Sequence, residues 1–250
     1  MTMNPKENEK KQMQKPYPTI NYDAHSRTVP REDYWRQVCR TQNGEPVSEE
    51  QIKIIVNAVI AGLKLCKQDI LLDLACGNGA LSRMLFDFCS GLVGVDISPY
   101  LIEIANQDFL RAPDYTFIAR GIYDYLETEA HPERFTKVLC YASIQYLSDP
   151  YLKEMLDILY KRFSKVSLVF IGNVPDKERA AFFYKNRIPS HEELTDPEAR
   201  IGVWRTKKEI ESLAEEAGWR IKFSSMPPDF YLSSHRYDVT LERGGKTWTR

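Results

Sequence analysis

The sequence predicts an α/β fold: a doubly wound, mostly parallel sheet of seven strands with one antiparallel strand near the C-terminus. Short apolar runs alternate with segments of helical periodicity from residue 48 onward, which is typical of right-handed crossovers between parallel strands. Residues 220–243 look like two strands joined by a Pro-rich connection. The chain has 250 residues and 43% apolar content, enough for one such domain with a full core.

The first elements of the domain have clear boundaries. Ser48 predicts a helix start, with Gln51 as its capping-box partner, and apolar residues then follow at helical spacing. The apolar run 70–74 predicts a buried strand, and an apolar stripe over residues 81–88 predicts the next helix. Residues 92–95 form a second strand, which ends at Asp96.

The later elements continue the alternation. Ser98 and Pro99 predict a helix start with proline at the first helical position. Another helix begins at residues 149–150, and a capping box of Thr206 and Glu209 opens the last one, which ends before Gly218. Residues 173–203 are charged and aromatic without a core stripe, so they predict an insert. Three further strands are expected at residues 115–119, 137–141 and 165–171.

The N-terminal region differs from the rest of the chain. Residues 1–16 are polar and rich in lysine and glutamate at their start, a composition typical of a disordered tail. Residues 17–47 mix aromatics, arginines and turn residues without a regular period. The expected organisation is therefore a tail (1–16), a separate N-terminal segment (17–47) and an α/β domain (48–250) that contains the insert.

Composition excludes several classes of function. With a formal net charge of -1, the chain has no overall positive charge that would attract nucleic acid or an anionic membrane. No apolar stretch approaches the ~20 residues of a membrane span, and the first residues lack a signal-peptide core. Five scattered cysteines and four distant histidines indicate free thiols and no metal site. We expect a cytoplasmic, metal-free protein.

The turn after the first strand points to a nucleoside ligand. Gly77 and Gly79 fall in this strand-to-helix turn, where glycine permits close backbone approach. Asp96 follows 19 residues after Gly77, at the end of the second strand, where a carboxylate can accept hydrogen bonds from both ribose hydroxyls. The alternative is a tight turn beside an unrelated surface acid.

The same turn argues against a dinucleotide. A dinucleotide fold requires a third glycine around the pyrophosphate, and Ser82 stands at that position. Asp73, four residues before Gly77, would repel a pyrophosphate but suits an ammonium or sulfonium group. The residues therefore favour a cationic nucleoside.

Three segments resemble the class I S-adenosylmethionine-dependent methyltransferases. DLACGNG (73–79) resembles their first motif, with Ala75 in the place of the first glycine. GVDISPYLIEIA (94–105) resembles the second motif, and YASIQYL (141–147) resembles the segment after their fourth strand. The resemblance covers residues 51–243 and implies S-adenosylmethionine as the cofactor.

The resemblance also implies roles for individual residues. Asp73 would lie near the methionyl amine, Asp96 would hold the ribose, and Ile97 would pack on the adenine. Relatives often carry an acid after the third strand, but ARGIYDY (119–125) places Gly121 or Ile122 there, so a contact from Asp124 stays open. The remaining expected cofactor contacts are Ala75, Cys76, Gly77, Asn78, Gly79, Tyr141 and Ala142.

In small-molecule members of this superfamily a segment such as 17–47 often closes over the cofactor. We therefore expect a helical lid in which Tyr22, Tyr34 and Trp35 cover the cofactor and Arg40 pairs with the methionyl carboxylate. The alternative is a helix that merely packs on the domain. The insert 173–203 would form the other wall of the acceptor pocket, through Phe182, Phe183, Tyr184 and Arg187.

Methyl transfer can proceed by alignment alone, with a base needed only when the acceptor must lose a proton. The catalytic residues are therefore unassigned, with His25, Tyr146 and His191 as candidate bases. Each residue also has a non-catalytic interpretation: Tyr146 could serve in helix capping or packing, and the two histidines could be solvated surface residues. Ser143 and Gln145 also follow the fourth strand, where helix capping is the favoured interpretation of Ser143.

The expected function is methyl transfer to an oxygen or nitrogen of a small molecule, by a monomer or homodimer. Residues 141–146 lack the NPPY or DPPY motif of enzymes that methylate amino groups of nucleic acids, and a protein substrate stays open. A second hypothesis is a cofactor-binding protein of this fold with a regulatory, non-catalytic role. A nicotinamide-dependent reductase is disfavoured by Asp73 and Ser82.

Overall fold

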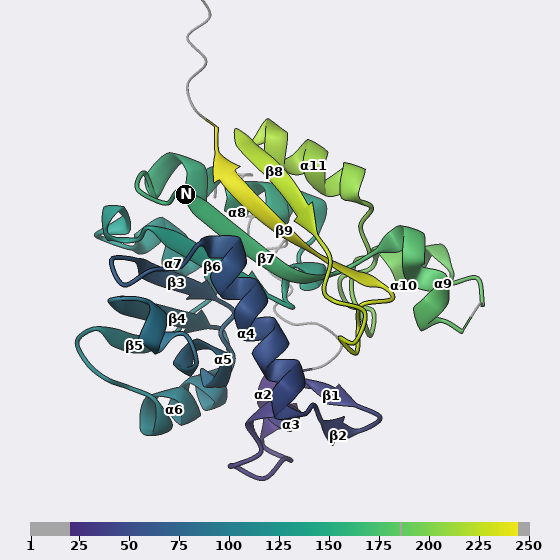
Figure 1. The fold of residues 1–250 in the computed structure, drawn as a ribbon, viewed down its shortest axis with the longest axis horizontal. Coiled ribbons are helices and arrows are strands. Elements are labelled where there is room, and N and C mark those ends of the chain that lie inside the picture. The colour runs from purple at the N-terminus through teal and green to yellow at the C-terminus, as the bar shows by residue number, and fades with distance from the viewer. Residues whose placement is uncertain (1–20, 186, 245–250) are drawn as a thin grey trace, which may run out of the picture.

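The computed structural model describes residues 21–185 and 187–244, and it contains the predicted seven-stranded sheet (Figure 1). The tail 1–16 and the first residues of the predicted lid lie outside the described residues. The strands run in the order β5-β4-β3-β6-β7-β9-β8. Their bounds are β3 (Ile70–Leu74), β4 (Gly91–Asp96), β5 (Tyr115–Ala119), β6 (Lys137–Tyr141), β7 (Leu168–Pro175), β8 (Trp219–Ser224) and β9 (Arg236–Arg243).

The sheet has the predicted mixture of directions. All pairs from β5 through β7 are parallel, and β9 is antiparallel to both of its neighbours, β7 and β8. From β3 the chain first builds β4 and β5 on one side, then crosses to β6 and β7 on the other. Open α/β sheets bind ligands beyond the carboxyl ends of the strands at such a reversal.

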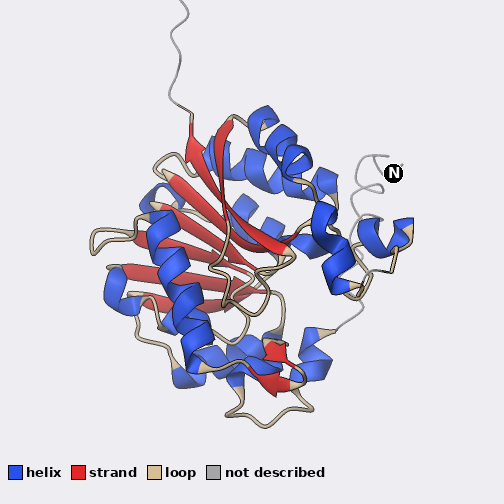
Figure 2. Cartoon of the chain, turned by 45° about the vertical axis from the view of Figure 1, so that its right-hand side comes forward, coloured by secondary structure: helices blue, strands red, loops and turns tan. Residues whose placement is uncertain are grey.

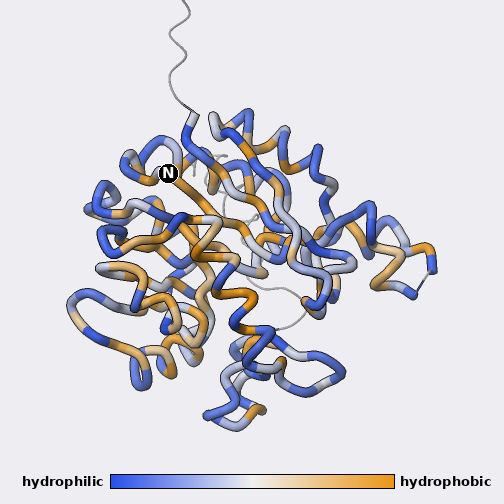
Figure 3. Tube along the Cα trace, in the orientation of Figure 1, coloured by the Kyte–Doolittle hydropathy of each residue, from blue (hydrophilic) through white to orange (hydrophobic). Residues whose placement is uncertain are grey.

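Helices cover both faces of the sheet (Figure 2). One apolar core joins the sheet to α4 (Glu49–Leu63), α5 (Ala80–Arg83) and α6 (Pro99–Asp108). The other joins it to α7 (Ile122–Thr128), α8 (Asp149–Arg162) and α11 (Lys207–Glu216). Apolar residues concentrate along the central strands and the inner side of α4, and polar residues on the periphery (Figure 3). Among the described residues, no helix is long and apolar enough to cross a membrane.

Of the two predicted capping boxes, the one at α11 is complete and the one at α4 is only half formed. Thr206 and Glu209 form a complete capping box at α11. At α4, Ser48 Oγ accepts a hydrogen bond from Gln51 N (3.4 Å), but the Gln51 side chain does not return to the cap. It instead bonds to the backbone of Asp229 and Tyr231 in the β8–β9 connection, at 2.9 Å each, so it fastens this loop to α4.

Two elements differ from the prediction. The helix expected over residues 81–88 ends at Arg83 and is followed by a 3-10 turn, Phe86–Phe88. The Tyr115 hydroxyl donates to the carbonyls of Phe86 and Cys89 at 3.0 Å, which stabilises the non-helical path. The fifth strand runs later than residues 165–171, because β7 pairs with β9 as far as Pro175 past an irregularity between Ile171 and Val174.

Two segments outside the sheet flank its carboxyl edge. The N-terminal segment forms α2 (Tyr22–Ser26), α3 (Tyr34–Gln37) and a hairpin of β1 (Thr41–Gln42) and β2 (Glu45–Pro46), which lie together at the bottom of Figure 1. The insert contains α9 (Ala180–Phe183) and α10 (His191–Thr195), which project to the right in the same view.

Candidate active site

A cavity of about 740 Å³ opens at the carboxyl ends of β3, β4 and β6, and the N-terminal segment and η3 (Ile144–Tyr146) line its other sides. It contains most residues that the sequence assigns to the cofactor, together with Asp124 and Tyr146. The assigned residues at its surface are Tyr22, Trp35, Arg40, Asp73, Ala75, Cys76, Gly77, Asn78, Asp96, Ile97, Gly121, Ile122, Tyr141 and Ala142. Gly79, His25 and His191 do not line it.

The turn after β3 has a left-handed backbone. Ala75, Gly77 and Gly79 have φ values of 59°, 60° and 75°. Alanine at the first position is strained, because the left-handed region is costly for a residue with a Cβ, and such strain is often kept at functional sites. Gly79 serves packing instead of ligand contact: a Cβ there would lie 2.8 Å from the Phe117 ring.

Asp96 organises the loop around it. Its Oδ2 accepts a hydrogen bond from Gly77 N (2.8 Å), and its Oδ1 accepts one from Ser98 N (2.9 Å). Each oxygen keeps a further lone pair, which suits the two hydroxyl donors of a ribose. The next residue, Ile97, is 45% exposed and lines the cavity, so an apolar surface for a flat base lies beside the carboxylate.

Asp73 is a buried carboxyl at the floor of the cavity. It is 3% exposed and accepts a hydrogen bond from Ser82 Oγ at 2.6 Å. Burial raises the pKa of Asp73 to about 7, against the lowering effects of the Ser82 hydroxyl and the Arg40 charge. A cationic ligand would relieve this cost of burying a charge. Ser82, which replaces the third glycine of a dinucleotide fold, therefore orients this carboxyl.

The N-terminal segment is fastened to the rim of the cavity. Asp23 Oδ1 accepts hydrogen bonds from Ser98 Oγ (2.8 Å) and Tyr100 N (3.0 Å), at the start of α6. The side chain of Asn78 donates to Tyr34 O and to Gln37 Oε1, both at 2.8 Å. These contacts join the N-terminal segment to the turn after β3 and to the start of α6.

The aromatic residues of the N-terminal segment differ in where they point: Trp35 lines the cavity, and Tyr34 contacts α6. Trp35 and Arg40 line the cavity, and the Arg40 guanidinium lies 5.3 Å from the Trp35 ring centre and 5.2 Å from that of Tyr141. Tyr34 was expected to cover the cofactor, but it points away. Its hydroxyl donates to Asp108 at 2.9 Å and its ring packs on Phe109, so it anchors the segment to α6.

Tyr146 is the one candidate base that the structure brings to the cavity. Its hydroxyl is 2.8 Å from that of Tyr22. His25 Nε2 is instead engaged with Arg36 O at 2.9 Å inside the N-terminal segment. His191 is exposed at the start of α10. Ser143, which lines the cavity, contacts Cys140 Sγ at 3.0 Å.

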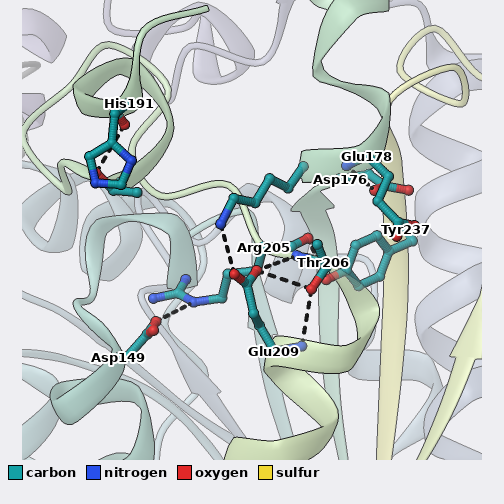
Figure 4. A network of polar contacts seen from close by, with 10 residues as sticks. Asp149, Asp176, Glu178, His191, Arg205, Thr206, Glu209 and Tyr237 are labelled. Carbon is teal, nitrogen blue, oxygen red and sulfur yellow. Dashed lines mark hydrogen bonds and ion pairs between the residues drawn. The ribbon is translucent and has the colours of Figure 1, made fainter.

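A polar network supports the segment that carries Tyr146 (Figure 4). Arg205, 1% exposed, donates to Ile144 O (3.1 Å) and Leu147 O (2.6 Å) and pairs with Asp149 at 2.8 Å. Glu209 completes the adjoining cap of α11 and pairs with Lys177 at 2.7 Å. His191 lies apart from these ion pairs in the same view.

The insert contributes other residues than those predicted. Phe183 and Tyr184 pack against Trp204, Arg187 pairs with Glu193 at 2.7 Å, and Phe182 is 66% exposed. Pro197 and Glu198 reach the cavity instead. The prediction missed these two because no local pattern marks them. It also missed cavity residues from other elements: Val38, Leu81, Leu101, Tyr123, Leu147, Ser148 and Tyr151.

Part of the chain is similar in sequence to methyltransferases. Residues 71–164 match a family described as "Methyltransferase domain". Two uncharacterized methyltransferases of Schizosaccharomyces pombe are 29% identical over 116 residues and 27% identical over 111 residues. These matches cover 46% and 42% of this chain but only 41% and 38% of the relatives, so this chain aligns with less than half of their length.

Solved structures share the fold at low identity. The cyclopropane synthase MmaA2 from Mycobacterium tuberculosis has a TM-score of 0.65 and 12% identity, covering 90% of this chain and 99% of its own. Magnesium protoporphyrin IX methyltransferase from Synechocystis, with bound S-adenosylhomocysteine, has a TM-score of 0.58 and 16% identity, covering 85% and 94%.

The reversal of strand order, the left-handed turn after β3 and the Asp96 carboxylate together define the nucleoside crevice of a class I methyltransferase fold. The chain has the class I methyltransferase fold of these solved structures, and residues 71–164 match the methyltransferase domain family. The residues fit S-adenosylmethionine: Asp96 suits its ribose, Ile97 its adenine and Asp73 its ammonium group.

Proposed function

We propose that this chain transfers a methyl group from S-adenosylmethionine to an oxygen or nitrogen of a small molecule by in-line displacement. The observation that carries the proposal is a single cavity of about 740 Å³ that contains both the Asp73/Gly77/Asp96 crevice and the Tyr146 region. Sites that enclose small ligands typically measure about 300–1,000 Å³.

The residues of the chain divide the cavity into two parts. Asp73, Asp96 and Ile97 lie on the side assigned to the cofactor, with Arg40 available for a carboxylate. Tyr146, Tyr151 and Glu198 lie on the side assigned to the acceptor. Bound S-adenosylmethionine supplies an electrophilic methyl group with a neutral thioether as leaving group. The chain contributes mainly by orienting the acceptor and excluding water.

A small acceptor is favoured over a macromolecule for two reasons. The lid is hydrogen-bonded to the cavity rim through Asp23 and Asn78, so large substrates would meet a covered site. The formal net charge is -1, which gives no general attraction for a polyanion.

Transfer of label from methyl-labelled S-adenosylmethionine tests this function. The protein is incubated with a cell extract separated into small molecules, protein and nucleic acid, and the label is counted in each fraction. We expect enzyme-dependent label in the small-molecule fraction, and none with an Asp96→Ala variant. Label confined to protein or RNA would contradict the proposed acceptor class, and absence of transfer to every fraction would favour the non-catalytic hypothesis.

A further inference from the structure

Arg236, the first residue of β9, is a buried cation without an anionic partner. Its residue is 8% exposed, its Nη1 donates to Asn173 O at 3.2 Å, and its Nε has no partner. It forms no ion pair with a carboxylate in the part of the chain that the structure describes. The nearest ring is Trp204, with its centre 5.6 Å from the guanidinium carbon.

Four tyrosines lie close enough to this guanidinium to influence its pKa. Burial lowers the pKa of Arg236 to about 10, and the neighbouring tyrosines Tyr146, Tyr231, Tyr141 and Tyr22 oppose this effect. The group therefore stays charged at neutral pH. Three of these tyrosines, Tyr22, Tyr141 and Tyr146, line the cavity. Arg236 lies close behind Tyr141, because it donates to the carbonyl of Asn173, the neighbour of the Gly172 that pairs with Tyr141 in the sheet.

The hydroxyls of this wall are poised to donate. Burial raises the pKa of Tyr22 and of Tyr141 well above the usual value, so both are neutral. The hydroxyl of Tyr141 is buried and has no hydrogen-bond partner among the residues that the structure describes. In the Tyr22–Tyr146 pair, one hydroxyl donates to the other at 2.8 Å, which leaves the second hydrogen free for a ligand.

The position of Tyr141 is fixed by close packing. Gly172 lies opposite it in the sheet, and a Cβ on that glycine would be 2.3 Å from the Tyr141 ring. The ring therefore lies directly over the glycine backbone. Its unpartnered hydroxyl is a fixed feature of the wall.

An unpaired buried cation and an unpartnered buried hydroxyl are both costly. An anionic group placed against the tyrosine wall would offset both costs, because hydroxyls bind oxyanions strongly and the Arg236 charge would act over a short, dry path. Resting on the proposed function, we propose that the methyl acceptor carries an oxyanion, a carboxylate or phosphoryl group, which the hydroxyls of Tyr22, Tyr141 and Tyr146 hold in front of Arg236.

The competing occupant of this wall is the carboxylate of the cofactor itself. Arg40 is the candidate for that group, because it lines the cavity and its charge lowers the pKa of Asp73, although it also lies beside the Tyr141 ring. Arg40 and Arg236 thus provide a matched pair of variants. Arg40→Gln should weaken cofactor-analogue binding, and Arg236→Gln should weaken acceptor-analogue binding.

The experiment uses S-adenosylhomocysteine-saturated protein and three probes of similar size: benzoate, phenyl phosphate and benzamide. Binding is measured by calorimetry. We expect at least one of the two anions to bind at least tenfold more tightly than neutral benzamide, which has almost the shape of benzoate. The preferred anion distinguishes a carboxylate acceptor from a phosphoryl acceptor.

With Arg236→Gln we expect anion affinity to fall at least tenfold and S-adenosylhomocysteine affinity to stay within threefold. Arg40→Gln, saturated at a higher S-adenosylhomocysteine concentration, should weaken the anion less than Arg236→Gln does. Tyr141→Phe and Tyr146→Phe, which keep the rings, should each weaken the anion severalfold. They serve as the test if Arg236→Gln does not fold.

Equal binding of benzoate, phenyl phosphate and benzamide, or saturable binding of none, would overturn the inference. So would loss of S-adenosylhomocysteine binding, instead of anion binding, in Arg236→Gln, since the wall would then hold the cofactor carboxylate. Failure of S-adenosylhomocysteine to bind the unmodified protein is a separate result, which would sink the proposed function.

Discussion

Asp73 and Asp96 lie in the neighbouring strands β3 and β4, but Asp73 is buried whereas Asp96 is only partly buried. Asp96 accepts two backbone N–H bonds, whereas Asp73 receives one hydroxyl bond. A carboxylate with few donors is more costly to ionise when buried, which explains why the pKa of Asp73 rises to about 7.

Asp73 should make ligand binding depend on pH. Burial raises the pKa of Asp73 from its ordinary value of 3.8 to about 7. The free energy of unfolding of the unliganded protein should therefore fall as pH rises from about 4 through about 7, where the buried carboxyl must ionise. Pairing with the ammonium of S-adenosylhomocysteine requires the ionised form. We therefore expect affinity to fall up to about tenfold per pH unit below pH 7.

Calorimetry in two buffers of different ionisation enthalpy measures the proton that Asp73 releases on binding. At pH 6 we expect release approaching one proton, and close to none at pH 8. An Asp73→Asn variant serves as the control, with weak affinity that no longer depends on pH in this range. A full pH dependence retained in Asp73→Asn would show that another group is responsible.

Asp96→Ala should weaken S-adenosylhomocysteine binding by roughly 2–4 kcal/mol, because two ribose hydroxyls lose a charged acceptor. The melting temperature should also fall, because Gly77 N and Ser98 N lose their acceptor. Calorimetry and thermal unfolding separate the two effects. Reduced stability with unchanged affinity would leave Asp96 a purely structural residue.

Individual cavity residues could be predicted where a strand end fixes them. Asp73, Gly77 and Asp96 reach the cavity because parallel strands present their carboxyl ends at one edge. Gly79 could not be assigned correctly, since its contact with Phe117 depends on how α6 and β5 pack. Arg236 could not be predicted, because it lies about 140 residues from Asp96 in the sequence and reaches Asn173, at the end of β7, only through the antiparallel pairing of β9.

At the scale of elements, the lid is held by a small number of polar contacts. Asp23 caps the start of α6, and Arg31 and Tyr34 both contact Asp108. Burial of apolar lid residues is limited, with Trp35 only partly buried against the core. Elements with few apolar contacts open at low free-energy cost, so this segment can admit ligands.

Asp23→Ala should loosen the lid. We expect faster amide hydrogen exchange over residues 22–40 and at least a threefold faster release of S-adenosylhomocysteine. Glu32→Ala is the matched control, since Glu32 is an exposed acid of the same segment without an anchoring contact to α6. In the unmodified protein, S-adenosylhomocysteine should slow exchange in residues 22–40. If exchange there ignores both ligand and mutation, the segment is a packing element and not a lid.

Removing residues 1–45 should leave every strand of the large sheet, so the shortened chain should fold with a lower melting temperature. It loses the partners of the buried Asn78 amide and of Ser98. We expect methyl transfer to fall more than tenfold, while S-adenosylhomocysteine binding weakens less. Full activity of the shortened chain would contradict a role in closure.

Elements with strong local signals were predicted well, and those set by tertiary contacts were not. α8 begins at Asp149, as the Asp149–Pro150 pair indicates, and α11 begins at Lys207, as the capping box of Thr206 and Glu209 indicates. α5 is short because the chain after it bonds to Tyr115 from a distant strand. The helices of the insert pack on Trp204, a contact that no period in residues 173–203 reveals.

At the scale of the whole molecule, one sheet supports two binding regions that differ in how the sequence encodes them. The cofactor region comes from consecutive strand-to-helix turns in residues 73–98, so local motifs describe it. The proposed acceptor region joins the N-terminal segment, η3 and the insert, and the start of β9 lies behind it. Residues far apart in the sequence form this region, so the proposed preference for an oxyanion could be inferred only from the assembled fold.

The central claim is that the crevice binds a cationic adenosine derivative and not a dinucleotide. The most direct test is calorimetric titration of the purified chain with S-adenosylhomocysteine, and with NAD and NADP under the same conditions. The account predicts saturable binding of S-adenosylhomocysteine and no measurable binding of either dinucleotide. Tighter binding of NAD or NADP than of S-adenosylhomocysteine would contradict it.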